Sequence, residues 1–339
     1  MKISVIVPIF NNEKYLDRAI NSLLSNINLD KLEIILIDDG STDNSFQICL
    51  KYANKYKNIK VVHQENEGVS SARNKGLSMV TGQYYTFLDS DDWIEQGYLN
   101  KCIQILTDED PDVLITPFKK IYSNKIIKNN PVKYIKKLDG RNILYALIGK
   151  QYSDKYYPAS VEDLNPVCGK FYKTSKFQAL KFDETISRSE DLIYNLEIFY
   201  NAKSCAYMGT SYYCYNRNNS NSTVSVFDSN LLSKFKTVYL RINDFILKNK
   251  LEDNCLDYLN NRIIFGLITT ITNCVRASHS IKEEKIVLND EMYSIAFESF
   301  KFKRLTLPYK LFFKLCEWKK SFMIFILAKT ALTFRSLHE

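Results

Sequence analysis

Three aspartates lie within four positions at Asp89, Asp91 and Asp92, directly after an apolar run that ends at Leu88. Carboxylates at this spacing can converge on a hard divalent cation, which prefers oxygen ligands. A cation held there would neutralise the phosphates of a bound nucleotide and a departing diphosphate. The same aspartates could instead cap a helix over Trp93–Leu99, because acidic side chains favour helix N-termini. The spacing alone leaves both interpretations open.

Side chains at four other places could take part in the same chemistry. A carboxylate at Asp38 or Asp39 could accept the imide N–H of a pyrimidine base, although the Asp-Gly pair that follows is also common in turns. Arg73 lies in a helical pattern of small residues, where a lone Arg is usually solvated, and Arg217 could grip a diphosphate. Glu190 and Asp191 precede an apolar helical pattern, where a carboxylate could be a general base or a helix cap.

Short apolar runs alternate with helical patterns over the first hundred residues. We expect buried strands at Lys2–Pro8, Leu32–Asp38, Ile59–His63 and Tyr84–Leu88, and helices at Tyr15–Asn26, Asp43–Tyr56 (with Asp43 as N-cap) and Val69–Met79. This alternation indicates an α/β fold with a mostly parallel sheet and helices on both faces. Ligands bind beyond the carboxyl ends of such strands, which here are Pro8–Glu13, Asp38–Asp43 and Asp89–Asp92. The candidate site therefore lies at that edge of the sheet.

The chain beyond residue 100 is less regular. We expect a hairpin or mobile loop at Lys119–Lys137, strands near Phe171 and within Tyr207–Tyr215, a helix at Asp191–Asn201, and long helices from Phe227 to about Cys274. We find no internal repeat and no low-complexity linker. A soft domain boundary near residue 225 is therefore expected.

The composition is that of a globular protein, with 45% hydrophobic and 25% charged residues. None of the eight cysteines forms a CxxC pair, and their spacings match no zinc template. The Met1 end has no charged-then-apolar leader. We therefore expect reduced thiols, no disulfides, no structural metal and a cytoplasmic location.

Most of the net charge of +8 lies in residues 300–339, which carry nine Lys and Arg side chains against Glu317 and Glu339. The nearly neutral remainder argues against nucleic-acid binding. Within this tail, Ser321–Phe334 holds only one charge, Lys329, and is shorter than the roughly 20 residues of a membrane span. Its basic and aromatic flanks predict a helix that binds the inner membrane leaflet peripherally. The alternative is a helix packed on the body or in a homodimer interface.

Four sequence blocks together resemble the family-2 glycosyltransferases, which are inverting enzymes with a GT-A fold. The blocks are SVIVPIFNNE at Ser4–Glu13, LIDDGSTD at Leu36–Asp43, NEGVSSARN at Asn66–Asn74 and FLDSDD at Phe87–Asp92. They cover residues 3–100 in the family's order and spacing. Ser189–Asp191 and Tyr213–Arg217 are looser, and are similar to patterns in capsule and lipooligosaccharide enzymes.

The resemblance implies a role for each nucleotide-binding position. Pro8, Phe10 and Glu13 would line the nucleotide pocket, with the Phe10 ring near the uracil. Many members of the family carry Tyr at the position of Phe10, so a hydroxyl contact would be lost here while the ring face remains. Asp39 would read the base, and Arg73 would hold the donor.

The resemblance also implies the catalytic groups. Asp89 and Asp91 would form the DxD motif, with Asp91 as the direct ligand of Mn²⁺ or Mg²⁺. Asp191 would be the general base. The implied reaction moves a hexose or N-acetylhexosamine from a UDP-sugar to a glycan or lipid-linked oligosaccharide during cell-surface polysaccharide synthesis. Residues 1–225 would form the GT-A domain, with 1–100 as its nucleotide-binding half and 101–225 as its acceptor half, and 226–339 would form a helical region with the basic tail.

Three other functions would each predict a different sequence pattern. A nucleotidylyltransferase needs a glycine-rich basic loop after the first strand, and a Rossmann dehydrogenase needs GxGxxG; Pro8–Asn12 contains neither. A non-catalytic module that binds nucleotide sugars or glycans would be favoured if the DxD motif or Asp191 were missing, and both are present.

Overall fold

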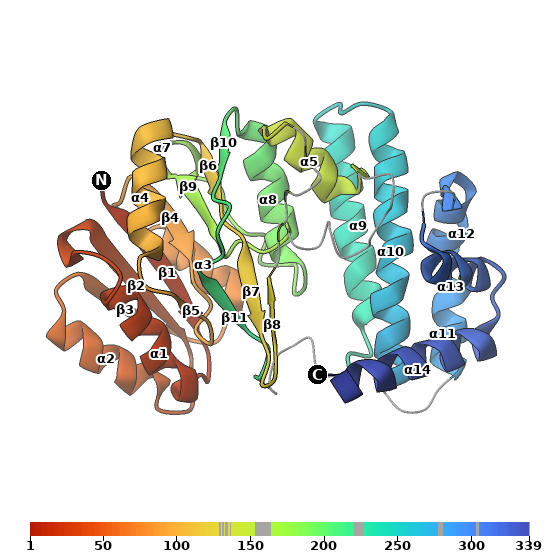
Figure 1. Ribbon diagram of the computed structural model, residues 1–339, viewed down its shortest axis with the longest axis horizontal. Helices are drawn as coiled ribbons and strands as arrows, with labels where there is room; N and C mark the ends of the chain where they lie inside the picture. Colours follow the sequence, from red (N-terminus) through yellow and green to blue (C-terminus); the bar gives the residue numbers. More distant parts are fainter. Residues whose placement is uncertain are drawn as a thin grey trace. The chain divides into compact units, whose positions relative to one another are not determined.

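The computed structural model describes residues 1–128, 130, 132, 135, 137–152, 164–219, 227–276, 281–302 and 305–338. The chain divides into two compact units (Figure 1). The first unit is Met1–Leu144 with Asp163–Asn219, and the second is Tyr145–Glu162 with Ser220–Glu339. Each unit is described by itself.

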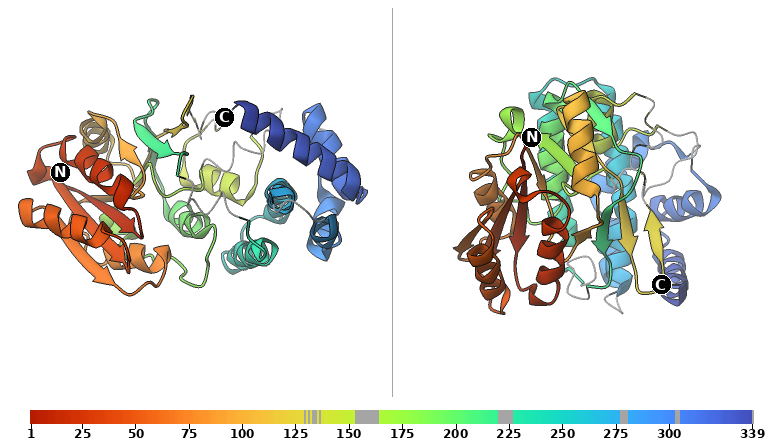
Figure 2. Two further views of the ribbon diagram at one scale, coloured as in Figure 1. Left: turned by 90° about the horizontal axis from the view of Figure 1, so that it is seen from below. Right: turned by 60° about the vertical axis from the view of Figure 1, so that its left-hand side comes forward.

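A seven-stranded sheet forms the centre of the first unit (Figures 1 and 2). Its order is β10 (Cys205–Tyr207), β6 (Val113–Ile115), β9 (Lys170–Lys173), β4 (Tyr84–Phe87), β1 (Ile3–Ile9), β2 (Leu32–Asp39) and β3 (Ile59–Gln64). All strands are parallel except β9, which runs antiparallel to both β4 and β6. The four strands expected from the first apolar runs are present, with bounds that differ by a residue or two. Every residue of β1, β2 and β4 is buried, which explains why these runs are apolar throughout.

Helices cover both faces of this sheet. The helices of the first unit are α1 (Glu13–Leu24), α2 (Ser45–Lys55), α3 (Val69–Leu77), α4 (Tyr98–Glu109), α7 (Thr174–Phe177) and α8 (Glu190–Asn201), while α5 (Gly140–Ile148) crosses the unit boundary and η1 (Leu29–Lys31) is a short 3-10 turn. His63 stacks on Phe46 of α2, whereas the next residue, Gln64, donates to Ser71 of α3. Because neighbouring residues of a strand point to opposite faces, α2 and α3 lie on opposite sides of the sheet.

The start of α2 corrects one expectation. Asn44 is the N-cap of this helix, one residue later than expected, and its side chain makes no capping hydrogen bond. Asp43 accepts instead from the backbone N–H groups of Ser45 and Glu13, at 2.9 and 3.0 Å. Asp43 therefore joins the loops after β1 and β2, which a capping residue alone would not do.

A second sheet of four short strands also belongs to the first unit. Its order is β5 (Trp93–Ile94), β11 (Tyr213–Asn216), β7 (Phe118–Ile121) and β8 (Ile126–Lys128). The β7–β8 pair is the hairpin expected in Lys119–Lys137, of which residues 129, 131, 133, 134 and 136 lie outside the described ranges. The interpretation of Trp93–Leu99 as a capped helix is wrong, because Trp93 and Ile94 pair with β11 and the helix begins only at Tyr98.

The second unit is helical. It contains α9 (Leu231–Lys248), α10 (Asn254–Arg276), α11 (Ile281–Leu288), α12 (Glu291–Ser299), α13 (Leu307–Glu317) and α14 (Ser321–His338). Helices α9 and α10 lie side by side, and α14 packs on α10, α11 and α13 (Figures 1 and 2). In the part of the chain that the structure describes, no helix is long and apolar enough to cross a membrane. All eight cysteines lie in described ranges and are free thiols.

Candidate active site

A buried arginine connects two groups of acids at the edge of the large sheet. Arg73 projects from α3 and is 4% exposed. Its Nη1 donates to Glu190 Oε1 at 2.9 Å and to Asp191 Oδ1 at 2.7 Å, and its Nη2 lies 3.3 Å from Asp89 Oδ1. Asp89 follows β4, and Glu190 and Asp191 open α8. The fold thus brings together three of the predicted site positions, which are 16 to 118 positions apart in sequence.

Asp191 is held on both carboxylate oxygens and still reaches the surface. Its Oδ1 accepts from Arg73, its Oδ2 accepts from the backbone N–H of Val167 at 3.0 Å, and the side chain is 19% exposed. Burial raises the pKa of Asp191 to about 7, with the charges of Glu190 and Asp89 adding to the rise and Arg73 opposing it. A carboxylate with a pKa near neutrality is suited to taking a proton at physiological pH.

The first turn of α8 bears on the alternative role of these acids as helix caps. Ser189 occupies the N-cap position with a left-handed φ of 60° and makes no side-chain capping bond. Among the described contacts, Glu190 and Asp191 accept from Arg73 and Val167, and neither accepts from an N–H of the helix itself. The two carboxylates therefore face the site rather than the helix start.

The three aspartates after β4 have different environments. Asp89 is partly exposed, and Asp91 Oδ2 accepts from Asn219 Nδ2 at 2.9 Å. Asp92 is buried and accepts from the Tyr213 hydroxyl at 2.6 Å and from the Asn216 N–H at 2.8 Å. Asp92 thus fixes β11 beside the acidic loop, and Asp89 and Asp91 are the two aspartates of this loop that do not bind β11.

Burial raises the pKa of Asp91 and of Asp92, and the negative charge of Asp89 raises both further. The positive charge of Arg18 opposes the rise in the pKa of Asp91. Arg18 Nη2 donates to the Asp91 backbone carbonyl at 2.9 Å, and the guanidinium lies 3.7 Å from the centre of the Trp93 ring. Within the described ranges, no three His, Cys, Asp or Glu side chains gather closely enough to hold a metal ion by themselves. A cation here would need oxygen atoms from a bound substrate.

The loop after β1 carries three predicted nucleotide-binding residues. Pro8 is buried in β1 beyond the part of the strand that pairs with β4, so its missing N–H leaves no gap in that ladder. The Phe10 side chain is 48% exposed. Glu13 Oε2 accepts from the backbone and side-chain nitrogens of Asn44 at 2.9 and 2.8 Å. Phe10 therefore presents a free ring face, whereas Glu13 already ties the two loops together.

Asp39 is buried at the end of β2 and already accepts three hydrogen bonds. Its Oδ1 accepts from Gln64 Nε2 and the Glu67 N–H at 2.8 and 3.0 Å, and its Oδ2 accepts from the Gly68 N–H at 2.9 Å. A carboxylate oxygen can accept two hydrogen bonds, so Oδ2 keeps one acceptor position. This remaining position on Oδ2 could accept an N–H group of a nucleotide base.

Arg217 follows β11 and lies near Tyr215 rather than near Arg73. Its Nη1 donates to the Tyr215 hydroxyl at 3.2 Å, and its backbone N–H donates to the Ile121 carbonyl at 2.9 Å. Its buried Nε has no hydrogen-bond partner in the described part of the chain. The guanidinium therefore keeps donor capacity for an anion.

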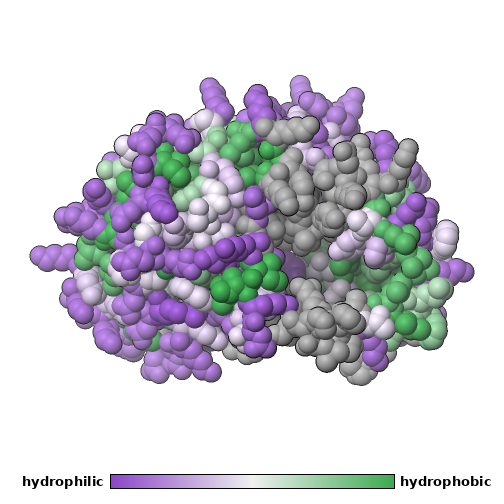
Figure 3. Space-filling view, viewed as in Figure 1, coloured by the Kyte–Doolittle hydropathy of each residue, from purple (hydrophilic) through white to green (hydrophobic). Residues whose placement is uncertain are grey.

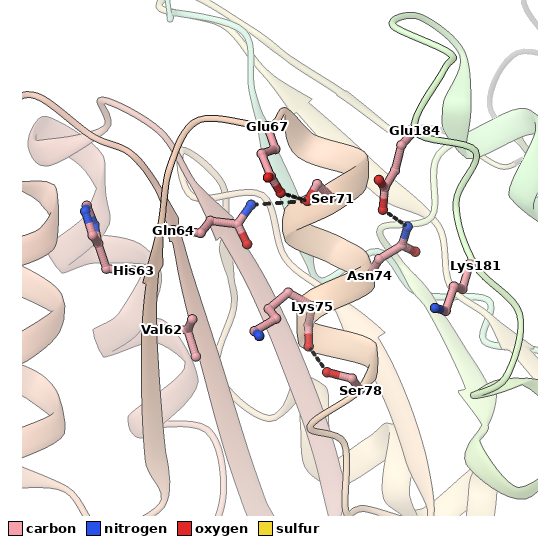
Figure 4. Close-up of a pocket in the computed structure, with 10 residues that line it drawn as sticks. All are labelled: Val62, His63, Gln64, Glu67, Ser71, Asn74, Lys75, Ser78, Lys181 and Glu184. Atoms are coloured by element: carbon pink, nitrogen blue, oxygen red, sulfur yellow. Dashed lines mark hydrogen bonds between the residues drawn. The ribbon is translucent and has the colours of Figure 1, made fainter.

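A pocket of about 380 Å³ lies beside β3 and α3 (Figure 4). Gln64, Glu67 and Ser71 line it, and Gln64 reaches across to Ser71. None of the predicted site residues is among its lining residues, although Gln64 and Glu67 also bind Asp39. The pocket therefore adjoins Asp39, where the nucleotide base is expected. The acids that gather around Arg73 do not line it.

Several site residues could not be found from the sequence. Arg18 lies in an ordinary amphipathic helix, Asn219 and Val167 match no motif, and Tyr213 opens one of the looser blocks without a role being assigned to it there. Asn12 is a partial exception, because it stands in the first block and its Nδ2 donates to Ser90 at 2.6 Å, which links the loop after β1 to the acidic loop. A search for polar residues within or beside every block would have found Asn12, Tyr213 and Asn219, but not Arg18 or Val167.

Comparison with known proteins places this arrangement in a family. Residues 4–161 match the family described as Glycosyl transferase family 2. Glycosyltransferase GlyA of Streptococcus pneumoniae is 32% identical over 63% of this chain, which spans only 30% of GlyA's length. The uncharacterized glycosyltransferase EpsJ of Bacillus subtilis is 26% identical over 95% of this chain and 94% of its own length.

The fold has solved counterparts. The structure of residues 1–349 of S. aureus TarS in complex with UDP-GlcNAc superposes with a TM-score of 0.69 at 21% identity, covering 98% of this chain and 92% of that one. At that identity the likeness shows the fold, and it includes the C-terminal helices. The expected α/β fold with a helical C-terminal extension is confirmed. Residues 4–161 of the chain belong to glycosyl transferase family 2, and the protein is a glycosyltransferase with the GT-A fold.

Proposed function

We propose that the chain transfers a hexose or N-acetylhexosamine from a UDP-sugar to a glycan or lipid-linked hydroxyl with inversion of configuration. The observation that carries this proposal is the Arg73 network, which connects the candidate base Asp191 to the DxD residue Asp89. A single displacement with inversion requires one site that holds both the departing diphosphate and, across C1 from it, a base for the acceptor hydroxyl.

The chemistry follows from the positions of these groups. The acceptor oxygen attacks C1 of the donor sugar as the bond from C1 to the diphosphate oxygen breaks, and the diphosphate leaves with that electron pair. The hydroxyl proton passes to the Asp191 carboxylate, which becomes a carboxylic acid until it releases the proton to water. One displacement turns an α-linked donor into a β-linked product.

The acidic loop suits Mn²⁺ or Mg²⁺. The described site contains five carboxylates, at Asp89, Asp91, Asp92, Glu190 and Asp191. Its guanidinium groups are those of Arg73, which binds three of these acids, and Arg18, which donates to the backbone carbonyl of Asp91. Oxygen ligands and excess negative charge favour a hard divalent cation, which proteins often hold with one or two carboxylates and substrate phosphates. Asp91 and Asp89 would hold it, and it would supply positive charge to the departing diphosphate.

The nucleotide is proposed to be uridine diphosphate. Asp39 keeps one acceptor position for an imide N–H, and the exposed Phe10 ring can stack on a flat base. Guanine has the wider ring system and offers a different donor pattern. Calorimetry with UDP and GDP tests the proposal, and tighter binding of GDP would overturn it.

The acceptor is proposed to be part of a cell-surface polysaccharide, reached from the inner face of the membrane. The second unit exposes apolar side chains along α13, α14 and the turn between them: Leu307, Leu311, Trp318, Phe322 and Ile326. Exposed lysines lie among them at Lys310, Lys319, Lys320 and Lys329. We call these nine residues the basic apolar face. Figure 3 shows hydrophobic surface over part of the C-terminal helices on the side that it draws.

Lysines mixed with exposed aromatic residues suit the headgroup region of an anionic bilayer. We expect the double variant Trp318→Ser and Phe322→Ser to lose vesicle binding roughly tenfold or more. Sedimentation with phosphatidylglycerol-containing vesicles measures this loss, and Leu240→Ser with Leu247→Ser on α9 is the matched control. If the wild type binds vesicles no better than the double variant, or if the variant instead halves the mass of a homodimer in the absence of lipid, the membrane proposal fails.

The competing hypothesis is a module that binds nucleotide sugars or glycans without turnover. Release of UDP from a panel of UDP-, GDP- and TDP-sugars, with and without oligosaccharide acceptors, separates the two. The proposed enzyme releases UDP and extends an acceptor with at least one UDP-sugar. Tight binding of a UDP-sugar that is never consumed with any acceptor would favour the module.

A further inference from the structure

The hydrogen bonds of Arg73 are directed to protein acids. Both N–H groups of Nη1 are used by Glu190 and Asp191, and Nη2 faces Asp89. A donor diphosphate could take these bonds only by displacing carboxylates from a side chain that is 4% exposed. This geometry differs from the donor-holding role that the family resemblance implies for Arg73.

Aromatic rings fix the plane of the Arg73 guanidinium. Its central carbon lies 5.3 Å from the centre of the Phe182 ring and 6.0 Å from that of Phe87. Phe182 in turn stacks on Tyr194 of α8 at 4.0 Å, with the two ring planes nearly parallel. The element that carries Asp191 and the cation that binds Asp191 are thus packed against the same ring. A guanidinium held in this way can orient a carboxylate, because its donors form a rigid fork.

Asp191 has little orientational freedom in this arrangement. Arg73 binds one carboxylate oxygen, and the Val167 N–H binds the other. Glu190 shares the same Nη1 with Asp191, so the two adjacent acids cannot exchange places without breaking a charged hydrogen bond. The acceptor hydroxyl would therefore meet one fixed carboxylate.

We propose that Arg73 is a positioning residue for the base. It holds Asp191 toward the acceptor and ties the base to Asp89, and it does not hold the donor nucleotide. The inference rests on the proposed function, since it presumes that Asp191 takes the proton.

The experiment compares Arg73→Lys and Arg73→Gln with the wild-type full chain. We expect kcat at saturating donor to fall about tenfold for Arg73→Lys and about a hundredfold for Arg73→Gln, the size of effect that a misplaced catalytic group produces. The Kd for UDP, measured by calorimetry, should change by less than about threefold. The rising limb of the kcat–pH profile should move to higher pH in Arg73→Gln, because a positive charge next to Asp191 has been removed.

Arg141→Gln is the matched control, because Arg141 lies over Tyr200 and has no part in the network. It should leave both kcat and UDP affinity unchanged. A tenfold or larger loss of UDP affinity in either Arg73 variant, or unchanged kcat in both, would overturn the proposal. If Arg73→Gln does not fold, Arg73→Lys alone carries the comparison, since it keeps the charge.

Failure of this inference differs from failure of the proposed function. UDP affinity tests Arg73 without any turnover. A chain that transfers no sugar, or an Asp191→Asn variant with full activity, would overturn the proposed function whatever the Arg73 variants do.

Discussion

Glu33 and Glu284 are both carboxylates inside a compact unit, and their surroundings differ. Glu33 lies in β2 and accepts from the Ser4 hydroxyl, from the Thr81 N–H at 2.9 Å and the Thr81 hydroxyl at 2.8 Å, and pairs with Lys60 at 2.8 Å. Burial alone would raise the pKa of Glu33, but the hydrogen bonds from Lys60, Ser4 and Thr81 outweigh it and lower the pKa to about 2. Its charge is thus fully compensated.

Glu284 lies on α11 in the second unit and is 0% exposed. Neither of its carboxyl oxygens has a hydrogen-bond partner among the described residues. The negative charge of Glu284 adds to the rise in pKa that burial causes at the thiols of Cys274 and Cys316. Burial raises the pKa of Glu284 to about 7. The second unit therefore holds an acid that costs stability when ionised.

The acids of the active site are intermediate between these two cases. Asp191 has partners on both oxygens, as Glu33 has, yet its pKa is raised, because burial is not offset by the one guanidinium that three acids share. Burial also raises the pKa of Asp91, which accepts from Asn219 on one oxygen. The site thus resembles Glu284 more than Glu33, and in the proposed reaction a cation and the acceptor's proton would neutralise its negative charge.

The largest expected effect is loss of activity on removing one of these uncompensated acids. Asp91→Asn should lower turnover by about three orders of magnitude or more, because it removes a ligand of the cation that neutralises the diphosphate. Sugar-transfer assays measure the loss, and thermal unfolding should show a fold that is nearly unchanged. Asp108→Asn on the exposed side of α4 is the control. Activity that survives EDTA unchanged would contradict the metal assignment.

Removing the compensated acid should destabilise the first unit. Glu33→Gln places an amide N–H₂ among donors and loses the Lys60 pair, at a cost of roughly 2 to 3 kcal/mol near pH 7. Because the pKa of Glu33 is lower in the folded state, its stabilising effect is present above about pH 4.5 and disappears as pH falls toward 2. Urea unfolding at pH 7 and pH 3 measures both values. If the free energies of unfolding of wild type and Glu33→Gln differ by the same amount at pH 7 and pH 3, the hydrogen bonds and the Lys60 pair do not stabilise the ionised Glu33.

Removing the uncompensated acid of the second unit should have the opposite sign. Glu284→Gln cannot ionise, so it should be more stable than the wild type by roughly 1 to 2 kcal/mol at pH 8. The pKa of Glu284 is raised in the folded state, so the wild type loses stability as pH rises from about 4.5 through 7. Near pH 4.5 the two proteins should unfold at about the same temperature. A variant that is less stable at pH 8 would show that Glu284 has a partner in the folded protein.

A further prediction concerns the pH dependence of turnover. Asp191 must be ionised to take a proton, and its pKa is raised to about 7. The rate at saturating donor should therefore fall about tenfold for each pH unit below 7 and level off above it. A rate that stays constant down to pH 5 would mean either that the base is another residue or that Asp191 has an ordinary carboxylate pKa.

The regular part of the fold could be predicted from sequence for a simple reason. Strands buried on both faces must be continuously apolar, and β1 and β2 are buried at every residue. The motifs then located the acids, since parallel strands end at one edge of the sheet. These signals are local, so a single sequence is enough to show them.

The contacts that define the site are not local. The Asp92–Tyr213 hydrogen bond joins residues 121 positions apart, and it decides that Trp93 continues as a strand rather than a helix. The hydrogen bonds from Arg73 to Glu190 and Asp191 join α3 to α8. The sequence of neither helix predicts this contact. The uncompensated Glu284 could not be predicted either, because α11 also contains the half-buried Glu283 and the exposed Lys282 and Lys285.

The assignment of Asp191 as base is tested most directly by comparing Asp191→Asn with Glu190→Gln in the same sugar-transfer assay. Both variants keep side-chain volume and lose basicity. Asp191→Asn should lower turnover by roughly two to four orders of magnitude with UDP affinity nearly unchanged, because the base contacts the acceptor and not the nucleotide. Glu190→Gln should retain far more activity. Near-wild-type turnover in Asp191→Asn, with or without loss in Glu190→Gln, would contradict the account.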